Sequence, residues 1–237
     1  MPQQHGRLFL LPSPIVEGDL TGIPQHVIQI LHGLRYFIVE RERTARRFIA
    51  ATKPHVPIAE LLLYEMPEQP DSIQRAELQL KPLLEGHDLA ILSEAGLPAI
   101  ADPGSVYVTA AHRLGIEVIP LAGPSSMMMA LMASGLEGQR FAFHGYLSAK
   151  KEDLIRQLRD LEHRADRDDA TQLFMEAPYR NHQILEAVEK GLNPERMFCI
   201  AAGIGGENAM IKTKSMKKWK KSGWPEIHKV PAVFLLR

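Results

Sequence analysis

The chain has 237 residues, of which 45% are hydrophobic and 24% are charged, and these values exclude a disordered chain. Lys plus Arg and Asp plus Glu both number 28, so the formal net charge is zero and a chain-wide electrostatic attraction to nucleic acid is not expected. The single cysteine, Cys199, excludes an intrachain disulfide and a zinc site built on several thiolates. Without a signal-peptide pattern or an apolar run of roughly 20 residues, we expect a cytoplasmic protein with no membrane span.

The first half of the chain alternates short apolar runs with amphipathic segments. We expect strands at residues 8–11, 36–39, 89–92 and 117–120, and helices at residues 23–34, 44–51, 72–85 and 106–114. Residues 57–64 fit either a helix or a strand. Strands that alternate with helices at this spacing predict a mostly parallel, doubly wound sheet. We therefore expect a first α/β domain over residues 1–119.

The second half restarts the pattern and predicts a separate α/β domain over residues 120–237. Its expected strands are residues 141–143, 172–175, 197–201, 209–215 and 230–236, and its expected helices are residues 127–134, 150–164 and 181–190. Residues 164–169 are expected to form a polar turn, and a Lys-rich helix lies between the last two strands. Met127, Met128 and Met129 are expected to lie in a helix core.

Two loops follow expected strands and are too rich in Gly, Pro and Ala to continue a regular element. The strand at residues 89–92 runs into SEAGLPAIADPG, and the strand at residues 117–120 is followed by LAGPSS. In an open α/β sheet, ligands bind where loops leave the carboxyl ends of strands. By composition alone the same loops also suit plain turns, and Glu94 and Asp102 also suit surface or helix-capping carboxylates.

Five segments occur in an order and spacing that resembles the tetrapyrrole (corrin and porphyrin) methylase superfamily. They read LFLLPSPI, ILSEAGLPAIADPG, IPLAGPSS with ASGL, F-x-GYL with KK, and FMEAPYR, and they run from Leu8 to about Arg180. The branch with the greatest resemblance is similar to ribosomal RNA small-subunit methyltransferase I. The resemblance implies two α/β domains, S-adenosylmethionine (SAM) folded into the cleft between them, a homodimer, and 2′-O-ribose methylation of small-subunit ribosomal RNA.

The resemblance also implies which positions contact SAM. These are Pro14, Ser93, Glu94, Ala95, Gly96, Ile100, Ala101, Asp102, Ser125, Met175, Ala177 and Ala202. Small residues let backbone groups approach the adenine and methionine parts of SAM, and a carboxylate favours a hydroxyl, an ammonium or the sulfonium. No residue stands out as a general base for the acceptor, and the candidates are Glu94, Asp102 and Glu40.

Several positions depart from the pattern of that branch. Val16 stands where a glycine is usual, and Arg41 reverses a charge in the ERER segment. Residues 64–67 replace a segment that contains His and Asn, and residues 202–208 replace an Arg-Glu-Leu-Thr-Lys stretch. These changes remove polar groups expected near the acceptor, so the acceptor is less well defined than the methyl donor.

Two basic clusters bear on RNA binding. The first, residues 41–47, contains four arginines around one helix start and is the better candidate for acceptor contact. The second is formed by six lysines around Trp219, and we favour a solvated helix face with the Trp packed inward. Residues 203–206 lack P-loop spacing and are expected to form a turn, and the scattered histidines indicate no metal site.

Three functions therefore stay open. The first is SAM-dependent methylation of ribosomal RNA, free or in the small ribosomal subunit, at a ribose hydroxyl. The second keeps SAM but methylates a small molecule such as a tetrapyrrole. The third is a protein that binds SAM without catalysis.

Overall fold

The computed structural model describes residues 5–67 and 73–237. The chain forms two compact units, residues 1–125 and 126–237. Residues 120–125, which the sequence pattern places in the second domain, pack in the first unit. Pro120 pairs with Leu10 at the end of a parallel strand pair, and Gly123 lies so close to Pro12 that a Cβ there would meet the Pro12 side chain at 2.2 Å.

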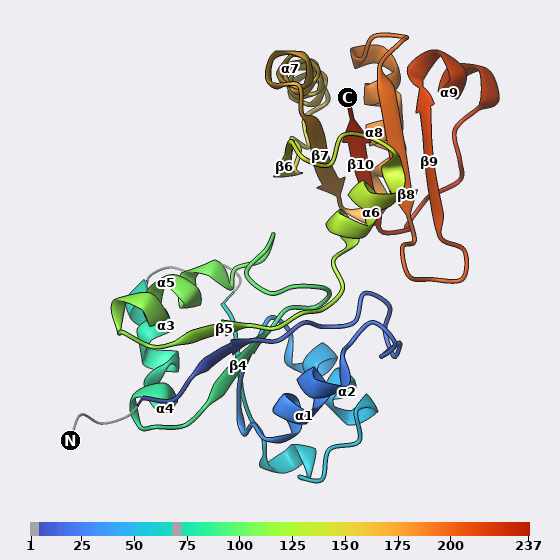
Figure 1. The fold of residues 1–237 in the computed structure, drawn as a ribbon. Coiled ribbons are helices and arrows are strands. Elements are labelled where there is room, and N and C mark those ends of the chain that lie inside the picture. The colour runs from blue at the N-terminus through green and yellow to red at the C-terminus, as the bar shows by residue number, and fades with distance from the viewer. Residues whose placement is uncertain (1–4, 68–72) are drawn as a thin grey trace. The chain divides into compact units, whose positions relative to one another are not determined.

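The first unit contains one parallel sheet of five strands (Figure 1). The strands are β1 (Leu8–Leu10), β2 (Tyr36–Val39), β3 (Leu62–Glu65), β4 (Leu89–Leu92) and β5 (Val118–Pro120), in the spatial order β3-β2-β4-β1-β5. Strand β4 is buried along its whole length, with β1 and β2 as its parallel neighbours. A central strand buried on both faces explains the continuous apolar run at residues 89–92.

Helices cover both faces of this sheet, as the doubly wound prediction requires. They are α1 (Gln25–His32), α2 (Glu42–Ala51), α3 (Ile73–Gln79), α4 (Lys81–Leu84) and α5 (Ser105–Arg113). Helices α1 and α2 pack on the face that contains Phe9 and Phe37, whereas α3, α4 and α5 pack on the face that contains Leu8 and Ile38. Leu8 and Phe9 are adjacent in β1 but pack in the cores on opposite faces of the sheet, because side chains alternate along a strand.

Residues 73–85 differ from the expected single helix, and residues 57–64 resolve the ambiguity between helix and strand. The helix expected at residues 72–85 is broken at Leu80 into α3 and α4, because Pro82 has no N–H with which to continue the helical ladder. Its expected first residue, Ser72, lies outside the described residues. Residues 57–64 contain both alternatives, a short 3₁₀ turn η1 (Ile58–Glu60) followed by β3.

The second unit contains a mixed sheet. Its strands are β6 (Phe141–Tyr146), β7 (Thr171–Glu176), β8 (Met197–Ala202), β9 (Met210–Ser215) and β10 (Ala232–Leu236), in the order β6-β7-β10-β8-β9. Only the β6–β7 pair is parallel, and the other three neighbouring pairs are antiparallel. The last strand therefore lies in the middle of the sheet, between β7 and β8.

Helices again cover both faces. They are α6 (Ser126–Ser134), α7 (Lys151–Asp168), α8 (Asn181–Gly191) and α9 (Met216–Ser222), with a 3₁₀ turn η2 (Pro178–Arg180) before α8. Helices α7, α8 and α9 bury the larger core, around Phe174 and Phe234, whereas α6 packs on the opposite face through Ala130 and Leu131.

Two expectations for these helices were wrong. Residues 164–168 are helical, because Ala165 continues the buried stripe of α7 and Arg164 pairs with Asp160 one turn earlier. Met128 and Met129 are each 37% exposed, because α6 meets its sheet through Ala130 and Leu131, with Met127 packed against the same core.

The core around Phe174 gives a test of the second unit. Phe174 is fully buried and stacks on Phe234 with ring centroids 5.3 Å apart. We expect Phe174→Ala to lower the free energy of unfolding of this unit by about 3–5 kcal/mol, and Phe141→Ala, at a ring that is 42% exposed, to lower it far less. Urea unfolding followed by fluorescence reports on this unit because Trp219 and Trp224 both lie in it. Equal losses in the two variants would contradict the assignment of the core.

Candidate functional site

The expected binding loops meet at the switch point of the first sheet. Strands β1 and β4 are neighbours, but the chain leaves β1 toward α1 on one face and leaves β4 toward α5 on the other. Ser13 and Gly96 exchange two backbone hydrogen bonds, of 2.8 and 3.0 Å. Diverging connections at a switch point leave a crevice beyond the strand ends, which is where open α/β sheets bind ligands.

Two serine hydroxyls fix the shape of these loops. The Ser13 hydroxyl donates to the Ser93 carbonyl at 2.8 Å, and the Ser93 hydroxyl donates to the Ala95 carbonyl at 3.2 Å. Both serines are buried, and Gly96 has a φ of 75°, which favours glycine. Ala95, between these fixed points, is exposed. The loop is therefore held by internal hydrogen bonds and presents Ala95 outward.

Two of the three candidate carboxylates lie together beside this loop. Glu40, which directly follows β2, accepts a hydrogen bond from the backbone N–H of Glu94 at 2.9 Å. The Glu94 carboxylate in turn accepts from the Thr44 hydroxyl at 3.1 Å. Burial raises the pKa of the Glu40 carboxyl, and the negative charges of Glu94 and Asp102 raise it further, against the lowering effect of the Glu94 N–H and Arg41.

The third candidate, Asp102, is engaged within its own loop. Its carboxylate accepts from the backbone N–H of Ala99 at 2.9 and 3.0 Å and from that of Gly104 at 2.7 Å. Ala99 and Ala101 both have positive φ, 64° and 62°, a backbone conformation that costs energy for a residue with a Cβ. Asp102 therefore stabilises a strained turn just before α5, and burial raises its pKa.

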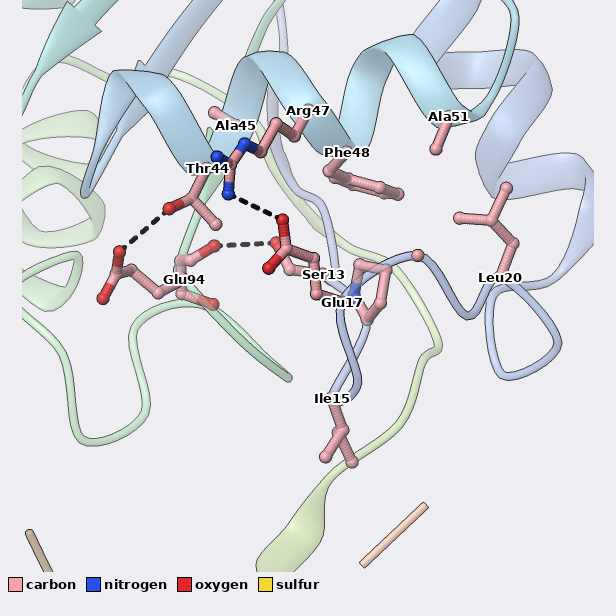
Figure 2. Close-up of a pocket in the computed structure, with 13 residues that line it drawn as sticks. Ser13, Ile15, Glu17, Leu20, Thr44, Ala45, Arg47, Phe48, Ala51 and Glu94 are labelled. Carbon is pink, nitrogen blue, oxygen red and sulfur yellow. Dashed lines mark hydrogen bonds and ion pairs between the residues drawn. The ribbon is translucent and has the colours of Figure 1, made fainter. Parts of the chain in front are cut away.

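A pocket of about 370 Å³ opens between these loops and α2 (Figure 2). Pro14, Ser93 and Glu94 of the expected SAM contacts line it. The remaining lining residues are Ser13, Ile15, Glu17, Gly18, Leu20, Thr44, Ala45, Arg47, Phe48 and Ala51. Arg47 and Phe48 reach from α2 toward the loop after β1, where Arg47 pairs with Glu17 at 2.9 Å. The pocket thus combines an apolar wall with two carboxylates, Glu17 and Glu94, and one guanidinium, which is paired with Glu17.

Sequence reasoning missed the contribution of α2 to this pocket. Thr44 and Phe48 are one turn apart on a helix whose pattern looks like an ordinary amphipathic segment. Of the arginine cluster, only Arg47 lines the pocket, whereas Arg46 is held by Glu42 and by the Ile58 carbonyl.

Ile100 lies in a second hollow, of about 410 Å³, on the β5 side of the same loop. Its lining is mostly apolar and includes Leu97, Pro98, Val108 and Pro120. Ile100 is 46% exposed. Residues 97–100 therefore give the β4 loop a second, apolar surface.

The expected SAM contacts in the second unit lie together at the carboxyl ends of two of its strands. Met175 and Ala177 lie at the carboxyl end of β7 and Ala202 ends β8, and Ala232 of β10 pairs with both Glu176 and Ala202. The buried Glu176 accepts from the Ala177 N–H at 2.8 Å and pairs with Arg180 at 2.9 Å. Ser125 is the last residue of the first unit, directly before α6.

Other expectations concern features outside these groups. Trp219 is only 2% exposed, so this side chain packs inward, as expected for the lysine cluster. Residues 203–206 form the expected turn, in which the Gly206 N–H donates to the Gly203 carbonyl. Within residues 5–67 and 73–237 we find no group of three or more His, Cys, Asp or Glu side chains placed to hold a metal ion. Across the same residues, every helix is too short or too polar to cross a membrane.

The first unit is a doubly wound parallel sheet and the second is a mixed sheet, each covered by helices on both faces. This arrangement defines a two-unit α/β protein. The chain belongs to the tetrapyrrole (corrin/porphyrin) methylases, whose family model matches residues 18–217. It is therefore a member of a methyltransferase family, and that membership implies SAM as methyl donor.

Curated relatives share the name ribosomal RNA small subunit methyltransferase I. The chain is 30% identical to the protein from Vibrio cholerae over 89% of its own length and 65% of the relative's length. It is 30% identical to the protein from Escherichia coli O157:H7 over 98% and 71%, respectively, and 31% identical to that from Bacillus subtilis over 77% and 59%. The chain thus spans about two thirds of the length of these relatives.

Solved structures of similar fold include two methyltransferases. The methyltransferase CobJ has a TM-score of 0.64 at 21% identity, with 98% of this chain and 93% of that chain covered. Uroporphyrin-III-C-methyltransferase from Thermus thermophilus has a TM-score of 0.58 at 17% identity, with 98% and 94% covered. These likenesses confirm the two-unit α/β fold.

The raised pKa of Glu40 predicts a pH-dependent stability. Because the folded protein keeps this proton to higher pH than the unfolded chain, the free energy of unfolding falls as pH rises from the ordinary Glu range through the raised pKa. Glu40→Gln removes this ionisation, and its amide oxygen still accepts from the Glu94 N–H. We expect Glu40→Gln to melt at a higher temperature than the wild type at pH 7.5, with the difference shrinking toward pH 4.

Scanning calorimetry across this pH range measures the effect. Glu117→Gln is the matched control, because Glu117 is exposed and precedes β5 in the same unit. A stability gain of Glu40→Gln that is absent at pH 7.5, or that grows as pH falls, would show that burial does not control this carboxyl.

Proposed function

We propose that this chain is a SAM-dependent methyltransferase that modifies small-subunit ribosomal RNA at a ribose 2′-hydroxyl. The observation that carries the proposal is the 30% identity over 98% of the chain to a ribosomal RNA small subunit methyltransferase I. The site chemistry supports it, because the first unit offers a pocket, small-residue loops and an uncompensated carboxylate at one switch point.

The loops after β1 and β4 suit SAM as ligand. SAM carries a sulfonium and an ammonium, and the adjoining carboxylates of Glu40 and Glu94 favour positive charge nearby. The pocket volume of about 370 Å³ falls within the usual range for a small ligand. The small side chain of the exposed Ala95 leaves room for a ligand on the outer side of the loop.

Methyl transfer needs alignment more than covalent help from the protein. The acceptor oxygen attacks the methyl carbon, the carbon–sulfur bond breaks, the sulfonium becomes a neutral thioether, and the hydroxyl proton leaves to a base. The carboxylates of Glu40 and Asp102 accept from backbone N–H groups. Glu94 lines the pocket, and among residues 5–67 and 73–237 its carboxylate accepts from one group, the Thr44 hydroxyl. We propose Glu94 as the group that takes the proton.

Helix α2 supplies the expected acceptor side of this pocket. Arg43 and Arg47 are exposed on α2, and Arg47 forms part of the pocket wall. A guanidinium is well suited to bind a phosphate group in two contacts. The Glu17–Arg47 ion pair is solvent-exposed and therefore weak, so an RNA phosphate competes for Arg47 at little cost.

A small-molecule acceptor is the second candidate. The apolar wall formed by Ile15, Leu20 and Phe48 favours it, because an apolar surface suits a planar organic ring. Labelling of RNA, described below, separates the two candidates from each other and from SAM binding without catalysis.

Ala95→Trp tests the location of the methyl donor. Ala95 is exposed, so the larger side chain leaves the core intact while it fills the space beside the loop. We expect calorimetry to detect no SAM binding by Ala95→Trp and wild-type binding by Ala59→Trp, a control at another exposed alanine of the first unit. Unchanged affinity in Ala95→Trp would place SAM elsewhere, and no binding by the wild type at millimolar SAM would refute the enzyme proposal.

Methylation of ribosomal subunits tests the acceptor and the base together. Small subunits from a strain that lacks its own small-subunit methyltransferase I are incubated with labelled SAM and the protein. We expect label in the RNA with the wild type, and a rate about 10²–10⁴-fold lower with Glu94→Gln when both proteins are saturated with SAM. An unlabelled RNA despite tight SAM binding would refute the RNA proposal, and an equal rate in Glu94→Gln would refute the base assignment alone.

A further inference from the structure

The zero net charge conceals an uneven distribution between the two units. Acidic residues outnumber basic ones by four in residues 1–125, and basic residues outnumber acidic ones by the same number in residues 126–237. The excess in the second unit coincides with five exposed lysines on β9 and α9. We call this surface the lysine face, and it consists of Lys212, Lys217, Lys218, Lys220 and Lys221.

Packing of α9 forces its lysines outward. Met216 and Trp219 are buried in the core of the second unit, where the Trp219 indole N–H donates to the Phe198 carbonyl at 2.9 Å. Trp219 also stacks on Trp224 with ring centroids 5.5 Å apart. Because residues 216 and 219 lie on one side of the helix, Lys217, Lys218 and Lys221 lie on the opposite side, whereas Lys220, one turn after Met216, is exposed at the border of the buried side. Their arrangement is a fixed consequence of the fold.

The lysine face is almost uncompensated by carboxylates. Lys217 pairs with Glu195 at 3.8 Å, but both side chains are 75% exposed, so this ion pair is weak. Lys212, Lys218, Lys220 and Lys221 form no ion pair with any residue in the described part of the chain.

Lys214 serves a different purpose and is excluded from the face. Its ammonium lies 4.4 Å from the centroid of the Trp219 ring and donates to the Ser222 hydroxyl at 2.7 Å. It therefore stabilises the junction between β9 and α9. Strand β9 is an edge strand of its sheet, and lysines on edge strands often prevent pairing with the edge of another sheet. This role accounts for Lys212 but not for the four lysines of α9.

We propose that the lysine face binds the phosphodiester backbone of RNA, an inference that rests on the proposed RNA substrate. Clustered ammonium groups neutralise phosphates and release counterions, whatever the base sequence. Because Trp219 is buried, the face offers no ring on which a base can stack, so it positions RNA without reading sequence. An anionic membrane is the poorer partner, because a membrane-binding helix turns its apolar side outward and α9 turns it inward.

Salt dependence of RNA binding tests this inference. One variant changes the four lysines without a described ion pair to Gln, namely Lys212, Lys218, Lys220 and Lys221. Its matched control changes four other exposed lysines to Gln, namely Lys53, Lys81, Lys190 and Lys229, so that both proteins lose the same charge. The probes are a 20-base-pair RNA duplex and a small-subunit ribosomal RNA transcript.

For the lysine-face variant we expect the slope of log Kd against log salt concentration to fall by about 3, since each lost phosphate contact contributes roughly 0.7–0.9. The control is expected to keep the wild-type slope. Equal slopes in the two variants would overturn the proposal, and so would binding to phosphatidylserine vesicles in place of RNA.

Two further measurements separate this inference from the proposed function. Both variants are expected to bind SAM with wild-type affinity in calorimetry, because no residue of the lysine face is among the proposed SAM contacts. If the wild type methylates small-subunit RNA but the lysine-face variant keeps the full salt slope, the inference fails and the function stands. If the wild type leaves this RNA unlabelled, the function fails, and the duplex still tests the lysine face.

Discussion

The paired backbone hydrogen bonds between Ser13 and Gly96 are the constraint on which the proposed site depends. Strands β1 and β4 send their connections to opposite faces of the sheet, and the contacts of α2 with the two loops, Thr44 to Glu94 and Arg47 to Glu17, are exposed to solvent. The reciprocal bonds, with the Ser13 hydroxyl on the Ser93 carbonyl, join the two loops at the strand ends. One wall of the pocket is therefore as rigid as the sheet beneath it, which is the condition for holding a methyl donor in line with its acceptor.

The three carboxylates near this junction, Glu40, Asp102 and Glu94, have different roles. Two of them stabilise backbone: Glu40 accepts from the Glu94 N–H, and Asp102 accepts from two N–H groups of a turn with strained alanines. Because those carboxylates are engaged, the ligand-facing negative charge falls to Glu94. A site that binds a cationic donor and removes one proton needs one such group. Of the two carboxylates in the pocket wall, Glu17 is paired with Arg47, which leaves Glu94.

Local sequence signals predicted the strands, the doubly wound first sheet and the loops, because buried strands and Gly-Pro punctuation are encoded within a few residues. Features that depend on distant partners were missed. Thr44 and Phe48 became pocket residues only when α2 packed beside the β1 loop, and Ala165 continued α7 because a core lay beneath it. The exposure of Met128 and Met129 likewise depends on how α6 meets its sheet. The family resemblance indicated contacts in both units, but it could not distinguish the engaged carboxylates from the available one.

Amide hydrogen exchange in the presence and absence of SAM tests the central claim most directly, since it locates the ligand in the unmodified protein. Slower exchange is expected at residues 13–18 and 93–104, which form the loops after β1 and β4. If SAM binds, as judged by calorimetry, and the exchange of both segments is unchanged, the switch point of the first sheet is not the methyl-donor site.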